Sequence, residues 1–345
     1  MLKITDTLQL QTPLILAPMS GITNGAFRSL IFRENKIVNS PINVSNSQTN
    51  NFLTNVDPTS EIENAVGLMV TEFVSVEALI RNNQRCLQML KFLPTEKPIA
   101  IQIFGYEINH MVQAAKMVEE FGADLLDINC GCPVPKVVRR GGGAELMRQP
   151  GHLRKMLSAI KKEIKIPIGV KIRSGWDEAH KNAIEIAKLV EAEGASMLTI
   201  HARTKVQGYS GKVDYNIVEE ICKSISIPTI GSGDICDIED AKFYLGLGVR
   251  GLMIGRASLK NPWVFKDIFN ALCGAVEQES RSYQEIVRIL RDYNFLLQND
   301  LPEKAILGRL KQLVAQITKG QVGGTKLRAA LCQAKTTEQF FELLC

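Results

Sequence analysis

The sequence places thiol, amine and imidazole groups directly after short apolar runs. Cys130 and Cys132 are followed by a proline and a polar stretch, which makes at least one of them a candidate for a reactive thiol. Lys171 follows the apolar run 167–170, and His201 follows a shorter one. Because such runs are typical of buried strands, we expect both side chains to project from the end of a strand into a protein-lined mouth.

Two glycine-rich turns favour a second kind of chemistry, the binding of a phosphate group. Residues 231–234 read Gly-Ser-Gly-Asp, and residues 255–256 read Gly-Arg. Backbone N–H groups in such turns bind phosphate oxygens, and the side chain of Arg256 adds a positive charge beside them. Each turn alone is a weak signal, but the two at this separation predict a phosphate site.

A metal site is one alternative for the two cysteines. Cys130 and Cys132 form a Cys-x-Cys pair, but no second pair of cysteines or histidines follows at a spacing that suits zinc. A purely structural pair of buried thiols is the other alternative. We expect no metal ion at this pair.

Eight short apolar runs alternate with amphipathic helical stretches, and they must position these groups. Eight strand–helix units over about 250 residues predict an α/β fold, the TIM (β/α)8 barrel. A doubly wound Rossmann sheet would have a G-x-G-x-x-G turn after the first strand, where residues 17–21 read Ala-Pro-Met-Ser-Gly. In a barrel the carboxyl ends of all strands meet at one rim, so the candidate groups should converge there. The predicted strands are residues 14–18, 68–73, 99–104, 125–129, 168–173, 197–202, 228–231 and 251–255.

The strand pattern ends after the eighth run, and the rest of the chain is helical in pattern. Ile286 and Leu290, for example, recur at helical spacing. The sequence therefore predicts two domains. The first is a catalytic barrel over residues 1–261 with a long polar loop over residues 34–66, and the second is a small all-α domain over residues 262–345.

Composition and charge exclude several classes of protein. Hydrophobic residues make up 45% and charged residues 22% of the chain, and the net charge is +5. No run approaches the roughly 20 apolar residues of a membrane-spanning helix. The N-terminus lacks the basic-then-apolar pattern of an export signal, and the eight cysteines are scattered. We expect a cytoplasmic monomer with reduced thiols and no membrane partner.

Several strings of this sequence together resemble the dihydrouridine synthase family, and two are most similar to its bacterial B-type branch. The similarity runs in order from about residue 14 to residue 265. It implies a flavin-dependent tRNA-dihydrouridine synthase, which uses FMN and the reductant NADPH to reduce the C5=C6 bond of specific uridines in tRNA to 5,6-dihydrouridine. The strings are Ala17-Pro18-Met19-Ser20-Gly21-Ile22-Thr23-Asn24, Gln102-Ile103-Phe104-Gly105, Asn129-Cys130-Gly131-Cys132-Pro133, Val170-Lys171-Ile172-Arg173-Ser174-Gly175 and His201-Ala202-Arg203-Thr204; those of the B-type branch are Gly175-Trp176-Asp177 and Gln207-Gly208-Tyr209-Ser210-Gly211.

The resemblance also implies roles for individual residues. Cys132 matches the acid that protonates the uracil ring, and a thiol with an ordinary pKa near 8.5 is protonated at neutral pH. Lys171 and His201 match contacts of the flavin ring and its ribityl chain, where either could offset the negative charge of the reduced ring. The other implied flavin contacts are Pro18, Met19, Ser20 and Gln102 at the ring and Ser232, Gly233, Asp234, Gly255 and Arg256 at the phosphate; the implied contacts of the target base are Asn129 and Arg173.

The chain departs from the family pattern in three places. Cys130 stands where methionine is common, Ser232 stands where asparagine is common, and the loop over residues 34–66 is unusually long. The extra thiol leaves Cys130 as a second candidate for the acid. The hydroxyl of Ser232 keeps a donor for the phosphate.

A basic stretch near the C-terminus agrees with an RNA partner. Between Lys304 and Arg328 lie six lysines and arginines and no acidic residue. A solvated helix usually mixes both signs, so we expect Arg309 and Lys311 to contact the tRNA backbone, with Arg203 extending the track near the rim. An FMN enzyme of a free pyrimidine would not need this stretch, and a non-catalytic RNA-binding protein would not need a flavin.

Overall fold

Eight parallel strands form a closed barrel in the computed structural model. Each strand pairs with the next along the chain, and β11 pairs with β3 to close the ring. All eight runs predicted as strands form barrel strands, which confirms the TIM barrel. The structure describes residues 1–37, 62–275, 281–299, 301–320 and 323–344. The barrel strands are β3 (Leu14–Leu16), β4 (Leu68–Val70), β6 (Ile99–Phe104), β7 (Leu125–Cys130), β8 (Ile168–Arg173), β9 (Met197–His201), β10 (Thr229–Ser232) and β11 (Gly251–Ile254), and β5 (Val74–Ser75) pairs beside β6.

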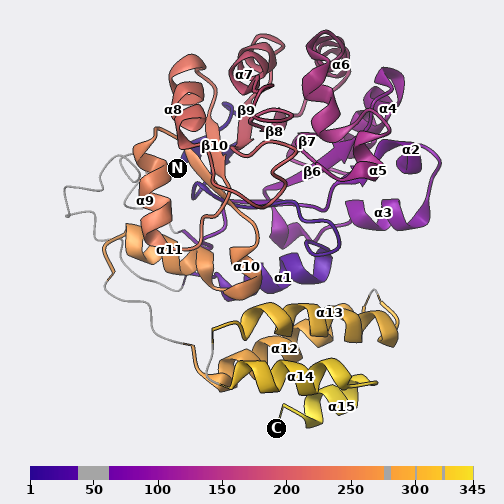
Figure 1. Ribbon diagram of the computed structural model, residues 1–345. Helices are drawn as coiled ribbons and strands as arrows, with labels where there is room; N and C mark the ends of the chain where they lie inside the picture. Colours follow the sequence, from indigo (N-terminus) through magenta and orange to yellow (C-terminus); the bar gives the residue numbers. More distant parts are fainter. Residues whose placement is uncertain (38–61, 276–280, 300, 321–322, 345) are drawn as a thin grey trace.

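Helices cover the outside of the barrel (Figure 1). Their apolar residues pack with the outward-facing residues of the strands in one continuous core. None of the helices that the structure describes is both long and apolar enough to cross a membrane. The helices are α1 (Gly25–Glu34), α2 (Val76–Leu79), α3 (Gln84–Leu90), α4 (Ile108–Glu120), α5 (Pro135–Val138), α6 (Pro150–Glu163), α7 (Ala183–Ala192), α8 (Tyr215–Ser224), α9 (Ile238–Gly246), α10 (Ala257–Lys260) and α11 (Val264–Leu272), with 3-10 turns at Pro94–Glu96 and Gly143–Arg148.

Helix α11 lies beyond the predicted domain boundary at residue 262. It nevertheless packs against α9 and α10, which belong to the outer layer of the barrel. These contacts support a boundary between α11 and α12, later than the sequence pattern indicated. The division into two domains otherwise stays a prediction.

The inside of the barrel changes character from one end to the other. Side chains alternate along a strand, so every second residue faces the lumen. Near the amino ends these residues are apolar, for example Leu125, Met197 and Ile230, and the hairpin of β1 (Leu2–Lys3) and β2 (Gln9–Leu10) packs against them and closes that end. Two or four residues further along the same strands, the inward positions are polar. They are Asn129 on β7, His201 on β9 and Ser232 on β10.

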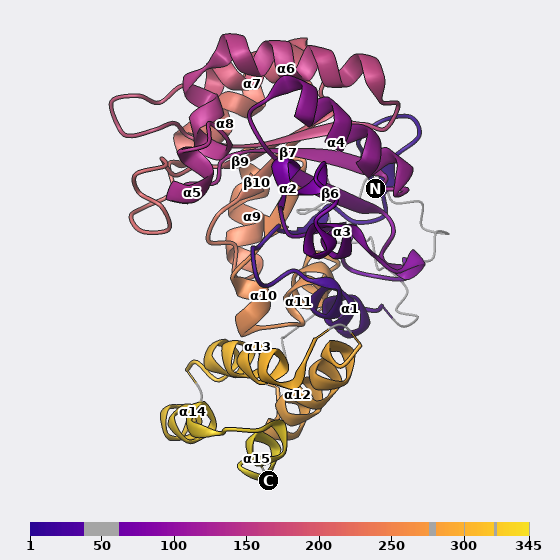
Figure 2. The same ribbon diagram turned by 90° about the vertical axis from the view of Figure 1, so that its right-hand side faces the viewer.

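The C-terminal helices lie along one side of the barrel (Figures 1 and 2). Helix α12 packs on α1, where Phe27 and Tyr293 meet edge to face with 6.2 Å between ring centroids. Arg288 on α12 donates to both carboxylate oxygens of Glu34 on α1, at 2.7 and 2.6 Å. Helix α1 is therefore covered by the barrel on one side and by α12 on the other. The C-terminal helices are α12 (Tyr283–Leu297), α13 (Glu303–Ile317), α14 (Gly324–Gln333) and α15 (Thr337–Glu342).

Most of the polar loop predicted over residues 34–66 lies outside the described residues. At its start, the buried side chain of Asn35 ends α1 and joins it to a distant segment. The Asn35 amide donates to the carbonyls of Ile31 and Pro262 at 2.7 and 2.8 Å, and its oxygen accepts from the backbone N–H of Lys266 at 2.9 Å. The first helix of the barrel is thus tied directly to α11.

Candidate active site

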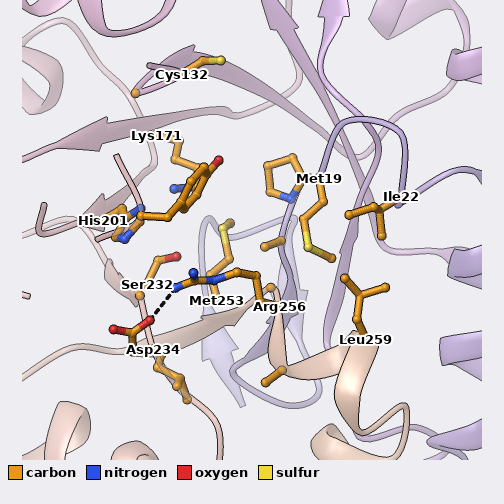
Figure 3. Close-up of a pocket in the computed structure, with 18 of the residues that line it drawn as sticks. Met19, Ile22, Cys132, Lys171, His201, Ser232, Asp234, Met253, Arg256 and Leu259 are labelled. Atoms are coloured by element: carbon orange, nitrogen blue, oxygen red, sulfur yellow. Dashed lines mark hydrogen bonds and ion pairs between the residues drawn. The ribbon is translucent and has the colours of Figure 1, made fainter. Parts of the chain in front are cut away.

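A cavity of about 670 Å³ opens at the carboxyl ends of the barrel strands (Figure 3). Its volume is in the range of cofactor sites in enzymes. Ser20 was expected at the flavin ring but lies off the wall of this cavity, as do Arg203, Arg309 and Lys311, which were expected to contact the tRNA backbone. The expected residues that line it are Pro18, Met19, Gln102, Asn129, Cys132, Lys171, Arg173, His201, Ser232, Gly233, Asp234, Gly255 and Arg256.

The two candidate thiols lie in different surroundings. Cys130 has no exposed surface and packs in the core between strands and helices. Cys132 is 7% exposed and lies in the turn after β7, on the wall of the cavity. The Oδ1 atom of Asn129 holds this turn by accepting from the backbone N–H groups of Gly131 and Cys132, at 3.2 and 2.8 Å. Burial raises the pKa of the Cys132 thiol, so it stays protonated at neutral pH and can donate a proton.

Lys171 and His201 line the same cavity but differ in charge. Burial lowers the pKa of Lys171 to about 8, and the neighbouring Arg173 adds to this effect. Burial, together with the surrounding lysine and arginines, lowers the pKa of His201 to about 2. Lys171 is therefore mostly a cation at neutral pH, whereas His201 is neutral. Of the two residues expected to offset negative charge, Lys171 is the one that can do so, and His201 acts as a neutral hydrogen-bonding group.

Two ion pairs of Asp234 hold the other side of the cavity, and Figure 3 shows the one with Arg256. Asp234 accepts from Arg256 Nη2 at 2.6 Å and also pairs with Arg203. Although burial alone would raise it, the two arginines lower the pKa of Asp234 below its usual value. Gly233 has a φ of 118°, and a Cβ atom there would lie 2.7 Å from the ring of His201, so glycine is required. The side chain of Arg256 remains 53% exposed at the rim, where it can meet an anion.

Comparison with known proteins identifies the family. The family model described as "Dihydrouridine synthase (Dus)" matches residues 15–344. The chain belongs to the dihydrouridine synthase family. It is 34% identical over 343 residues to the "Probable tRNA-dihydrouridine synthase" of Mycobacterium leprae, covering 96% of this chain and 86% of that protein. It is 32% identical over 285 residues to the "tRNA-dihydrouridine synthase B" of Pseudomonas putida, covering 82% of this chain and 76% of that protein. The resemblance expected from the sequence is confirmed.

As a dihydrouridine synthase, this protein is a flavin-dependent oxidoreductase, and the cavity fits such a cofactor. Lys171 supplies a cation to the cavity. Gly255 lies on the cavity wall beside Ala17 and Met19, because a Cβ atom there would be in van der Waals contact with both, at 3.4 and 3.6 Å. Arg256 supplies a second, exposed cation at the rim. A flat ring system with an anionic tail suits this arrangement.

Helix α13 forms a wall of the cavity opposite the strands of this dihydrouridine synthase. Gln312, Gln316 and Lys319 line the cavity from that side. Arg309 lies on the same helix, and its Nη1 atom is 3.3 Å from the position that a Cβ atom on Gly21 would take. The C-terminal helices therefore complete the cavity, and the sequence pattern did not indicate this.

Two of the cationic side chains expected to contact RNA have bonds inside the protein. Arg203 is 3% exposed, and besides Asp234 it binds the carbonyl of Gly211 at 2.7 Å. The Nζ atom of Lys311 donates to the carbonyls of Cys332 and Ala334 at the end of α14, at 2.7 and 2.6 Å. These contacts favour a structural role for both residues.

Arg173 and Tyr209 form a further part of the cavity wall. Arg173 is 2% exposed and donates to three backbone carbonyls in the loops after β7 and β9, at 2.7 to 3.0 Å. The ring of Tyr209 is 59% exposed and lies 5.5 Å from the guanidinium of Arg173 and 5.4 Å from that of Arg256. Sequence reasoning gave Tyr209 no role, although it lies within the string 207–211 that supports the family resemblance.

Proposed function

We propose that this dihydrouridine synthase reduces the C5=C6 bond of specific uridines in tRNA to 5,6-dihydrouridine, with FMN as cofactor and NADPH as reductant. The observation that carries the proposal is the buried, protonated thiol of Cys132 on a cavity that also contains the cation of Lys171. Reduction of the uracil bond adds a hydride at C6 and a proton at C5. A proton donor and a positive charge in one cavity suit that reaction.

The residues proposed to hold FMN form two groups. Gln102 and Lys171, with Pro18 and Met19, would bind the ring, and His201 would add a neutral hydrogen bond. When bound and reduced, the flavin supplies the hydride. Asp234 would hold Arg256 in place rather than touch the phosphate, because two anions repel each other. Ser232, Gly233, Gly255 and Arg256 would bind the phosphate through backbone N–H groups, a hydroxyl and one charge.

The protein residues proposed to act on the base lie at the Cys132 side. A uracil must leave the RNA stack to enter the cavity, and exposed Tyr209 offers an aromatic face beside the opening. Asn129 and Arg173 line the cavity next to Cys132 and are proposed to contact the edge of the base. Cys132 would then give its proton to C5 and regain one from solvent before the next turnover.

The tRNA backbone is proposed to lie across the rim and α13. Lys260 and Lys319 are exposed and line the opening, and Arg309 is close by on α13. Cations in this position would neutralise phosphates around an extruded base. We propose that the protein acts as a cytoplasmic monomer, with the helical domain after the barrel serving as the second contact for tRNA.

Two measurements test the function. The purified protein should contain about one FMN per chain, and with NADPH it should convert uridines of unmodified tRNA, located by mass mapping of the RNA. The same uridines should lack the modification in tRNA from a strain without the gene. Turnover of free uracil without any change in tRNA would show that the substrate is a small pyrimidine instead.

A further inference from the structure

A chain of buried hydrogen bonds connects a carboxylate to the turn that carries Cys132. Gln102 Nε2 donates to Asp127 Oδ2 at 2.5 Å, and Gln102 Oε1 accepts from Asn129 Nδ2 at 2.6 Å. Asn129 Oδ1 in turn accepts from the backbone N–H of Cys132 at 2.8 Å. Asp127, Gln102 and Asn129 are 1%, 0% and 5% exposed. Solvent therefore has little access to any link of this chain.

The strands on either side of β7 accommodate the carboxylate of Asp127. Asp127 on β7 lies in register with Gln102 on β6 and with Gly169 on β8. A Cβ atom on Gly169 would lie 3.0 Å from Asp127 Oδ1, which is closer than most side-chain contacts allow. The backbone of Gly169 does not need glycine for its φ angle, so the reason for the missing side chain is space. The neighbouring strand thus leaves room for the carboxylate and also for the side chains of Leu125 and Met197, which would lie 3.1 and 3.2 Å from the same Cβ atom.

The two ends of this series of hydrogen bonds determine which group donates and which accepts at every step between them. At the Cys132 end, backbone N–H groups can only donate, so the oxygen of Asn129 must face them. The Asn129 amide nitrogen must then donate to the Gln102 oxygen, which turns the Gln102 nitrogen toward Asp127. An ionised carboxylate can only accept, so Asp127 and the backbone of Cys132 demand the same orientation of both amides.

Stability does not explain the presence of Asp127. Burial raises its pKa to about 6, although the bond from Gln102 and the charge of Lys171 oppose this. Its Oδ1 atom has no hydrogen-bond partner among the residues that the structure describes. A buried carboxyl group with one oxygen unpaired is costly, and an apolar residue of similar shape would serve the barrel better.

We propose that Asp127 is a positioning residue for Cys132, acting through Gln102 and Asn129. By fixing both amides it holds the Gly131–Cys132 turn in one position, with the thiol directed at the base. This inference rests on the proposed function, in which Cys132 gives the proton.

Two rates test the proposal, and both are measured on the flavin-loaded protein. The first is alkylation of Cys132 by iodoacetamide without RNA, located by tandem mass spectrometry. The second is single-turnover reduction of unmodified tRNA. In Asp127→Ala the turn loses its anchor, so alkylation should become about three- to tenfold faster while base reduction becomes about tenfold slower. The thiol would be easier to reach and yet a poorer acid.

Two further variants separate positioning from general damage. Asp127→Asn keeps an oxygen that accepts from Gln102, so both rates should return to within about twofold of the wild type. Thr199→Val alters another buried polar side chain of the lumen, whose hydroxyl has no partner among the described residues, and it should leave both rates unchanged. Equal damage in Asp127→Asn and Asp127→Ala would overturn the proposal, because only the charge would then matter.

A double-mutant cycle tests whether the effect passes through Asn129. If it does, Asp127→Ala should add little to the effects of Asn129→Ala on either rate. Effects that multiply instead would show that the two residues act independently, and the proposal would be wrong. Should Asp127→Ala fail to fold, as judged by thermal melting and flavin content, Asp127→Ser replaces it, because the serine hydroxyl is too short to reach Gln102.

The alkylation measurement also separates this proposal from the proposed function. If the wild type does not reduce tRNA at all, the function is wrong, but alkylation still reports whether Asp127 holds the turn. If the wild type reduces tRNA and Asp127→Ala alters neither rate, the function stands and the role of Asp127 does not.

Discussion

The two sides of the cavity are held by different kinds of interaction. On the Cys132 side, buried amides and backbone groups form short hydrogen bonds, and the one carboxylate, Asp127, is hidden beneath them. On the other side, Asp234 binds both Arg203 and Arg256. Of these two arginines, Arg256 has a side chain that is about half exposed. Hydrogen bonds have direction and are lost within a few tenths of an ångström, whereas charges act over longer distances. The first side is suited to aiming a proton, and the second to retaining an anion.

The largest effect is expected from a substitution on the Cys132 side of the cavity. Cys132→Ala should lower the rate of tRNA reduction by about 10²- to 10⁴-fold, since a positioned general acid contributes on that order. Flavin content and NADPH oxidation should not change, because the thiol is proposed to act on the base and not to hold the cofactor. Single-turnover assays and flavin absorbance measure the two properties separately.

Cys130→Ala is the matched control for that variant. It removes a thiol two residues away that packs in the core, so activity should stay within about threefold and only thermal stability should fall. An inactive Cys130→Ala with an active Cys132→Ala would reverse the assignment of the acid.

The second effect is expected from a substitution on the side of the cavity that Asp234 and Arg256 hold. Arg256→Ala should raise the Kd for FMN about ten- to hundredfold, because a charge-assisted contact contributes about 1.5–3 kcal/mol. Titration of the apoprotein with FMN measures this Kd. Arg250→Ala removes an exposed arginine just before β11, at the opposite end of the strand, and should leave the Kd unchanged. Equal weakening by both would point to net charge rather than to a phosphate site.

A smaller effect concerns Lys171, which lies between the two sides. Its pKa of about 8 means that the cation is lost as the pH rises from 7 to 9. Reduction of the flavin by NADPH should therefore slow several-fold over this range, by stopped-flow absorbance. Lys171→Arg keeps its charge and should remove the inflection near pH 8 from the pH profile of flavin reduction. If the profile of this variant is unchanged, the inflection belongs to another group.

The same shift affects stability in a defined direction. Because the pKa of Lys171 is lower in the folded protein than in the unfolded chain, folding carries a penalty at every pH below about 8. This penalty disappears as the pH rises from about 8 to the unfolded value. The contribution of this group to the free energy of unfolding therefore increases over that interval.

The smallest expected effect extends the comparison to α13. Neutralising Arg309 and Lys319 together should reduce the slope of log affinity for tRNA against log salt concentration by about 0.7–0.9 for each phosphate that is no longer neutralised. Filter binding at several salt concentrations gives the slope, and flavin content should not change. Lys311→Ala should instead lower the melting temperature, because that ammonium holds the end of α14. A slope that responds to Lys311→Ala alone would return this residue to the RNA interface.

The sequence was sufficient for the barrel and for one side of the site. Each strand is a local apolar run, and barrel geometry brings the end of every run to one rim, so Cys132, Lys171 and His201 could be placed together without coordinates. The α13 wall could not be predicted, because its position depends on how α12 packs against α1.

Charge states and partners were the other properties that local sequence did not reveal. The neutral state of His201 depends on its burial and on cations from several strands and loops. Arg203 and Lys311 are basic in sequence, but their bonds to Asp234 and to the end of α14 depend on tertiary contacts. Asp127 resembled an ordinary strand residue until the register placed it beside Gln102 and Gly169.

The hairpin of β1 and β2 has a consequence for the order of events in turnover. Because it closes the amino end of the lumen, we expect the reductant and the RNA of the proposed reaction to enter at the carboxyl end, where the cavity opens. Under the proposed function we expect the two substrates to compete for that opening, so that each leaves before the other arrives. Steady-state rates should then give parallel lines in double-reciprocal plots, and high tRNA concentrations should inhibit by keeping NADPH out.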